Sequence, residues 1–170
     1  DRVDHFLRDV RNSPKGGEGF YQQYEDIAGE LVNNLVAQKC RLKQGDVANS
    51  PFGAEISTLE MLRHHQGADW SDWQPCQDTY VLLASDTGPG YFCAQVLRRL
   101  LTHRDFWAIP TDQVSEAPVV VPGLIDSPSS EENAKEALLQ LVSTVKDNLE
   151  PSARAPKVKR NVLVMTGGYK

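Results

Sequence analysis

The chain has 170 residues, of which 40% are hydrophobic and 24% charged, and its formal net charge is −5. A chain of this length and composition can bury a substantial core, which excludes disordered, collagen-like and disulfide-framework proteins. No apolar stretch approaches the roughly 20 residues of a membrane span, and the charged N-terminal residues do not resemble a signal peptide. The three scattered cysteines favour a reducing, cytoplasmic setting.

The charge is distributed unevenly along the chain. Residues 1–150 contain all 23 acidic side chains but only 13 of the 18 basic ones, whereas residues 151–170 contain five basic side chains and no acid. This distribution excludes a uniform basic coat for nucleic acid, but it is compatible with a local anion-binding site. We expect no metal site, because His64, His65 and Cys76 lack the spacing of metal ligands.

The first half of the chain predicts helices separated by loops. Residues 3–10 can begin a helix, residues 22–40 carry apolar side chains at helical spacing, and residues 54–65 predict a further helix. Residues 70–78 predict a polar and aromatic connection. Trp70, Trp73 and Trp107 are interpreted as surface or inter-subunit residues, because their irregular spacing does not form a base-stacking row.

The second half predicts alternating strands and helices. Residues 79–84, 119–121 and 161–165 are apolar runs of strand length, as expected for strands buried on both faces. The first intervening helix has Cys93, Val96, Leu97, Leu100 and Leu101 on its apolar side. The second, capped by Ser129 or Ser130, has a core stripe of Leu138, Leu141, Val142, Val145 and Leu149. This order predicts an α/β fold, with a Rossmann-like parallel sheet and helices on both faces, as a single domain over residues 1–170.

Two of the three predicted strands end in small, polar loops that contain glycine. The first continues into Ser85-Asp86-Thr87-Gly88 and the last into Thr166-Gly167-Gly168-Tyr169-Lys170. In a parallel sheet such loops meet at the carboxyl edge, where ligands bind, and a helix N-terminus favours anions. Together they predict a site for a phosphate-rich or nucleotide ligand, although each loop alone is better explained as a helix cap or a turn. Neither matches a Walker loop or a dinucleotide-binding glycine motif.

The same segments carry a resemblance to a known family. Val81-Leu82-Leu83-Ala84-Ser85-Asp86-Thr87, together with residues 161–170, resembles the CRISPR-associated Rossmann-fold (CARF) domains, as do residues 54–59 and 121–124 in the same order. The resemblance covers residues 54–170 and points to sensor domains of type III ancillary nucleases and to stand-alone ring nucleases. The family's first strand and final helix find no match here, so we interpret the chain as an internal portion of a longer protein.

The resemblance implies binding of cyclic tetra- or hexa-adenylate, a second messenger of type III CRISPR defence, across a two-fold homodimer. Residues on one side of the ligand would be Ser85, Asp86, Thr87 and Gly88, and the floor would be Thr166, Gly167, Gly168, Tyr169 and Lys170. In ring-nuclease members the matching lysine aids metal-independent cleavage, in which a ribose 2′-hydroxyl attacks the adjacent phosphate. Lys170 would therefore be catalytic, stabilising the charge of the transition state. The resemblance implies no cofactor, no DNA and no membrane partner.

Three alternatives remain open at this stage. The chain could be a sensor domain that binds the ligand only to switch an attached effector, or an unrelated Rossmann-like nucleotide-binding protein. Arg98 and His103 also match the R-x4-H pattern of HEPN ribonucleases, in which an arginine polarises a phosphate and a histidine moves a proton. The same two residues are explained as basic side chains near the C-terminus of a helix, where they favour its dipole.

Overall fold

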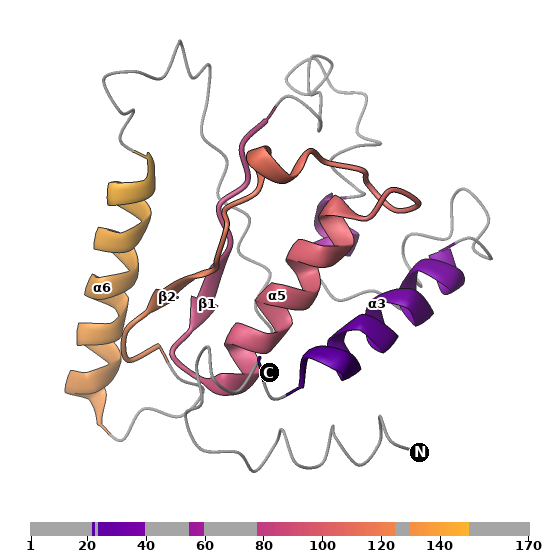
Figure 1. Ribbon diagram of the computed structural model, residues 1–170. Coiled ribbons are helices and arrows are strands. Elements are labelled where there is room, and N and C mark those ends of the chain that lie inside the picture. Colours follow the sequence, from indigo (N-terminus) through magenta and orange to yellow (C-terminus); the bar gives the residue numbers. More distant parts are fainter. Residues whose placement is uncertain (1–21, 23, 40–54, 60–77, 125–129, 150–170) are drawn as a thin grey trace.

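The computed structural model describes residues 22, 24–39, 55–59, 78–124 and 130–149. In chain order its elements are α3 (Glu25–Lys39), a helical segment at residues 55–59, β1 (Leu83–Ser85), α5 (Gly88–Thr102), the 3-10 helix η2 (Thr111–Gln113), β2 (Val119–Val121) and α6 (Glu131–Leu149) (Figure 1). The predicted helix start at residues 3–10, the predicted strand at residues 161–165 and the loop that follows it lie outside the described residues.

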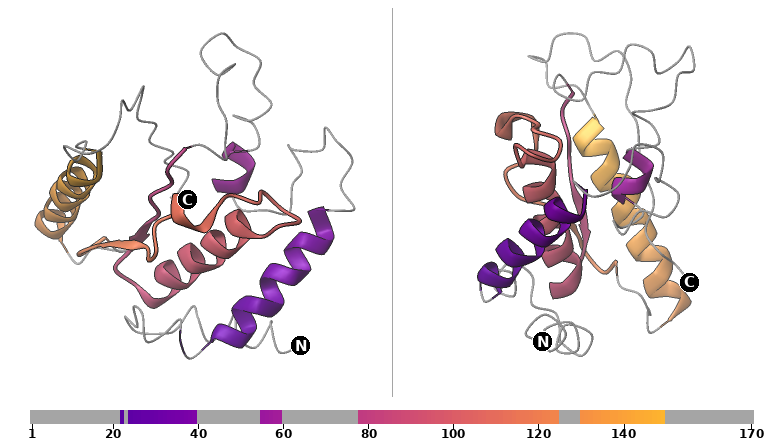
Figure 2. Two further views of the ribbon diagram at one scale, coloured as in Figure 1. Left: turned by 45° about the horizontal axis from the view of Figure 1, so that its top comes forward. Right: turned by 90° about the vertical axis from the view of Figure 1, so that its right-hand side faces the viewer.

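The two described strands are parallel. Leu83 pairs with Val119, and the register continues to Ser85 opposite Val121. Helix α5 connects the strands, and α3 packs against it. Figures 1 and 2 place α5 and α3 on one side of the strand pair and α6 on the other. The described residues therefore form a mixed α/β structure with parallel strands and helices on both sides, consistent with the Rossmann-like prediction.

Strand β1 begins later than the sequence predicts. Tyr80 forms an isolated parallel bridge with Val114, but the continuous ladder starts only at Leu83. Between these points the Leu82 N–H donates to the Ser115 hydroxyl at 3.3 Å instead of to a backbone carbonyl. Residues 116–118 depart from the ladder there, so the apolar run predicted over 79–84 is only partly a regular strand.

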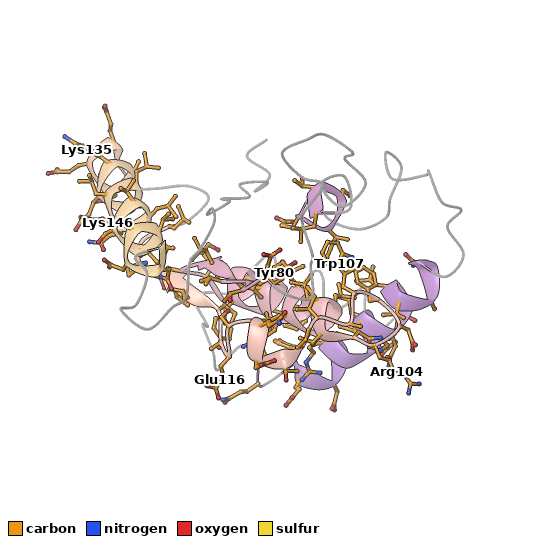
Figure 3. The ribbon with its side chains drawn as sticks, turned by 90° about the horizontal axis from the view of Figure 1, so that it is seen from above. Tyr80, Arg104, Trp107, Glu116, Lys135 and Lys146 are labelled. Carbon is orange, nitrogen blue, oxygen red and sulfur yellow. The ribbon has the colours of Figure 1, made fainter. Side chains whose placement is uncertain are left out.

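The main core lies between α3, α5 and the loop that follows α5. Ala28 and Leu101 are fully buried in it, and their neighbours come from the predicted apolar stripes of both helices. The prediction for Trp107 is wrong, because this side chain is buried in the same cluster (Figure 3). The chain turns back after α5, with Ala108 at a φ of 53° and the Ile109 N–H donating to the Leu101 carbonyl, which carries the indole inward.

Helix α6 packs with only part of the predicted core stripe, of which Leu141 and Val145 are half-buried. The Ser130 hydroxyl accepts a hydrogen bond from the Asn133 N–H at 3.1 Å, which fixes the helix start as expected. Ala137 is buried against the β2 side, whereas Leu138 and Val142, assigned to the core stripe, are 58% and 66% exposed. A small residue lets the helix approach the strand closely, which turns the larger side chains outward. No helix in the described part of the chain has the length and apolarity of a membrane span.

Candidate functional site at the carboxyl edge of the strands

The carboxyl ends of β1 and β2 bring two short connections together. Strand β1 ends at Ser85 and α5 begins at Gly88, with only two residues between them, while β2 ends at Val121 and continues into a Pro122-Gly123 turn. Because the strands are parallel and in register, both turns lie at the same edge. Ser85, like the two residues that follow it, is half-buried. The two turns therefore lie together at this edge, and the side chains of residues 85–87 remain partly accessible to solvent.

Two hydroxyl groups organise the start of α5. The Ser85 and Thr87 side-chain oxygens are hydrogen-bonded at 2.9 Å, and the Thr87 oxygen accepts the Gly90 N–H at 3.1 Å. Thr87 is the N-cap of α5, a role that contributes about 1 kcal/mol to stability in proteins. In the first turn of α5, Pro89 has no N–H group, and the N–H groups of Gly90 and Tyr91 donate to Thr87. For the remaining N–H, that of Gly88, the described residues provide no hydrogen-bond partner.

Gly90 allows this hydroxyl pair to form. A Cβ atom at position 90 would lie 1.9 Å from the Ser85 hydroxyl oxygen and 3.0 Å from that of Thr87. The first distance is far below a non-bonded contact, so a side chain at position 90 forces Ser85 or the helix to move. The predicted loop motif ends at Gly88 and does not assign a role to Gly90; a glycine two residues after Gly88, inside a helix, is the signal that was available.

Asp86 ties the two connections to each other. Its Oδ2 atom accepts the Gly123 N–H at 3.1 Å, and its own N–H donates to the Leu124 carbonyl at 3.0 Å. Gly123 has a φ of 72°, and the Leu124 N–H closes the turn on the Val121 carbonyl at 3.3 Å. Proline followed by a glycine of positive φ is typical of a type II turn. Asp86 therefore has a structural partner within the loop pair.

The structure thus brings together the predicted loop residues that follow β1. The side chains of Ser85, Asp86 and Thr87 are each hydrogen-bonded to another group of the protein. At this edge α5 presents its positive N-terminal end, in a first turn that contains no acidic residue, although Gly88 itself is buried. This arrangement favours an anionic group. Among the described residues no group of three His, Cys, Asp or Glu side chains could hold a metal. The remaining predicted site residues, Thr166, Gly167, Gly168, Tyr169 and Lys170, lie outside the described part of the chain.

Cys93 differs from its predicted place on the apolar side of α5, because it is exposed. Desolvation by neighbouring atoms raises the pKa of the Cys93 thiol, and the Glu55 carboxylate raises this pKa further. Both causes act against the thiolate, which is the nucleophilic form of cysteine. Cys93 is therefore poorly suited to nucleophilic chemistry.

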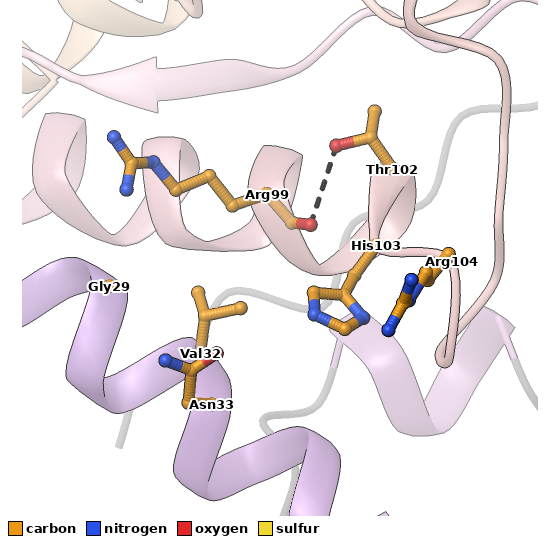
Figure 4. Close-up of a pocket in the computed structure, with 7 residues that line it drawn as sticks. All are labelled: Gly29, Val32, Asn33, Arg99, Thr102, His103 and Arg104. Atoms are coloured by element: carbon orange, nitrogen blue, oxygen red, sulfur yellow. Dashed lines mark hydrogen bonds between the residues drawn. The ribbon is translucent and has the colours of Figure 1, made fainter.

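The R-x4-H pair is not assembled into one site. Arg98 donates from Nε to the Ser115 carbonyl at 2.9 Å and so fastens the segment before β2 to α5. His103 is the C-cap of α5 and its ring faces α3 (Figure 4). Five residues along a helix correspond to a rotation of about 140° between the two side chains, so they point to different surroundings. The geometry does not support the ribonuclease alternative.

The fold and the edge site define a mixed α/β domain with parallel strands and an anion-favouring loop before a helix. A family model described as CRISPR-associated protein (Cas_APE2256) matches residues 50–170, which is most of the chain. The chain belongs to this family of CRISPR-associated proteins. No curated protein and no solved structure matches the chain.

Proposed function

We propose that this chain binds a cyclic oligoadenylate, the second messenger of type III CRISPR defence, at the carboxyl edge of its parallel strands. The observation that carries the proposal is the N-terminal end of α5, which has no acidic residue in its first turn and follows a parallel strand in a member of a CRISPR-associated family. A cyclic oligoadenylate presents a phosphate at every step of its ring, so it supplies the anionic groups that such a turn favours.

The crossover geometry supports a second ligand-binding loop beside the first. Crossovers between parallel strands are nearly always right-handed. Since α5 and α6 lie on opposite sides of the strand pair, a parallel strand following α6 is expected beside β1, on the edge away from β2. If residues 161–165 form that strand, the loop beginning at Thr166 adjoins Ser85, and the pair of neighbouring loops is a topological switch point. Lys170 then supplies the cation of the site.

A two-fold symmetric ring requires a two-fold symmetric receptor, so we propose a homodimer as the binding species. Calorimetric titration of the purified chain with cyclic tetra-adenylate and cyclic hexa-adenylate tests this directly. One ring bound per two chains is the expected result. Absence of binding to both rings overturns the proposal, and binding of mononucleotides in their place would identify an unrelated nucleotide-binding protein.

The role of Lys170 is tested with a matched control. Lys170→Ala removes a charge-assisted contact to phosphate and should weaken ring binding about tenfold or more. Lys135→Ala removes the same charge from an exposed position on α6 and should leave affinity unchanged. Equal effects of the two substitutions, or none from either, would contradict the assignment.

A cleavage assay distinguishes a ring nuclease from a sensor that only binds the ring. Labelled ring is incubated with the protein in the absence of metal and the products are separated by chromatography. Linear products that carry a cyclic 2′,3′-phosphate indicate a ring nuclease, and their loss in Lys170→Ala assigns that lysine to catalysis. Binding without products indicates a sensor that switches an attached effector.

A further inference from the structure

A second feature of the molecule lies at the other end of α5. A hollow of about 530 Å³ opens between α3 and the C-terminal end of α5 (Figure 4). Its lining consists of Gly29, Val32, Asn33, Arg99, Thr102, His103 and Arg104. Helix α5 has 15 residues and an α-helix rises 1.5 Å per residue, so roughly 20 Å separates the hollow from the loop at Gly88. The two sites are distinct.

The lining side chains are rich in hydrogen-bond donors. Two arginines, one imidazole and one amide line the hollow, and none of the described lining residues is acidic. The His103 Nδ1 atom accepts the Asp105 N–H at 3.2 Å, which places the proton of the neutral ring on Nε2 and makes that atom a donor. Arg104 touches Asp105 through its Nε, at 3.3 Å, and its side chain is 89% exposed. Its terminal nitrogens are therefore accessible to a ligand.

Arg99 also lines the hollow and adds a positive charge to it. Its guanidinium lies over Gly29, where even a Cβ atom would come within 3.8 Å of Nη1. Its Nη2 atom pairs with the Glu25 carboxylate at 2.6 Å, and both partners are partly exposed. Glu25 thus occupies the anion-binding side of this guanidinium and competes with any anionic ligand for it.

We propose that this hollow binds a phosphate monoester, with His103 Nε2 and the Arg104 guanidinium as its donors. Figure 4 places these two side chains together at the end of α5, near Asn33 of α3, while Arg99 extends the other way along α5. A phosphate accepts several hydrogen bonds at once, and a guanidinium matches its oxygens in a fork. The lining has this set of donors, and the acidic groups beside them, Glu25 and Asp105, are paired with Arg99 and Arg104. The proposal does not depend on oligoadenylate binding.

The test follows the imidazole signals of the protein during titration with inorganic phosphate, AMP and adenosine, by NMR of histidine-labelled protein. Both phosphate-bearing probes should shift the His103 signals saturably, whereas adenosine should not. Tighter binding of AMP than of phosphate identifies a nucleotide as the ligand, and equal affinities identify the phosphate group itself. Arg104→Ala should weaken binding about tenfold. Glu25→Gln, which removes a negative charge beside the hollow, should strengthen it.

Three controls make the result decisive. Lys135→Ala removes an exposed charge on α6, on the far side of the molecule (Figure 3), and should leave affinity unchanged. Lys170→Ala tests the carboxyl-edge site and should also have no effect here. His103→Gln keeps a donor and should retain part of the affinity, measured by calorimetry because the reporting imidazole is lost. Linear, unsaturable shifts, or equal losses from Arg104→Ala and Lys135→Ala, would overturn the proposal in favour of nonspecific charge screening.

Discussion

The Asp86 carboxylate accepts the Gly123 N–H at 3.1 Å, and this side-chain bond, beside the backbone bond from Asp86 to Leu124, joins the connections that follow β1 and β2. It is a contact between residues 37 positions apart, at the edge where ligand binding is proposed. A carboxylate is a stronger acceptor than a neutral oxygen, so the bond is a charge-assisted one.

Substitution of Asp86 measures how much this hydrogen bond contributes to the free energy of unfolding. Asp86→Ala leaves the exposed Gly123 N–H to water and should lower the free energy of unfolding by about 0.5–1.5 kcal/mol. Asp86→Asn keeps a side-chain oxygen and should cost less. Urea denaturation of the three proteins gives the comparison. Equal stability of Asp86→Ala and the native chain would show that the bond contributes nothing in solution.

Gly90→Ala should destabilise the protein through a steric conflict with Ser85. The added Cβ would lie 1.9 Å from the Ser85 oxygen, and a conflict of this kind typically costs about 1–3 kcal/mol. Ser85→Ala removes that oxygen, so the double variant should recover part of the loss. A double-mutant cycle by thermal or urea unfolding reports the coupling. Strict additivity would contradict the proposed source of the strain.

Substitutions at two adjacent positions on α6 should change stability by different amounts, because one position is buried and the other exposed. Ala137 is buried beside Gly123, where a Cβ on the glycine would lie 3.9 Å from the alanine Cβ. Ala137→Leu has no space there and should lower stability by about 1–3 kcal/mol. Leu138→Ala alters an exposed side chain and should change stability by less than about 0.5 kcal/mol. A larger loss from Leu138→Ala would place this leucine in a packed interface.

Alkylation of Cys93 tests its electrostatic surroundings. The raised pKa keeps the thiol protonated near neutral pH, so its reaction with iodoacetamide should be slower than that of a free cysteine and should accelerate as pH rises. Glu55→Gln removes the negative charge, lowers this pKa and should increase the rate at neutral pH. Rates are best measured with Cys40 and Cys76 replaced by serine. No change in Glu55→Gln would exclude the carboxylate as a cause.

Local patterns predicted the helices and β2 well, because these elements depend on short-range spacing. The three valines of β2 form a strand where expected, and α5 begins directly after the Ser-Asp-Thr sequence. Ser130 caps α6 as predicted. In each case the residues that define the element are close together in sequence, so periodicity and capping preferences carry the information.

The errors arose where a long-range contact decides the outcome. Trp107 is buried because the chain turns back at Ala108, which no spacing rule indicates. The packed face of α6 follows from the close approach at Ala137, not from its largest apolar residues. In the site, the motif could identify Asp86 but not its partner Gly123, because that pairing exists only when two strands lie in register.

Ser115 forms three bonds in succession: its N–H donates to the Tyr80 carbonyl, its hydroxyl accepts the Leu82 N–H, and its carbonyl accepts from Arg98. Four residues later the Val119 N–H is again fixed on the Leu82 carbonyl, at 2.8 Å. Glu116 and Ala117, between these anchors, are exposed. Short exposed turns with firm anchors on both sides tolerate added residues. An epitope tag or a fluorophore-bearing loop inserted between them would report on the molecule without disturbing either of its proposed sites.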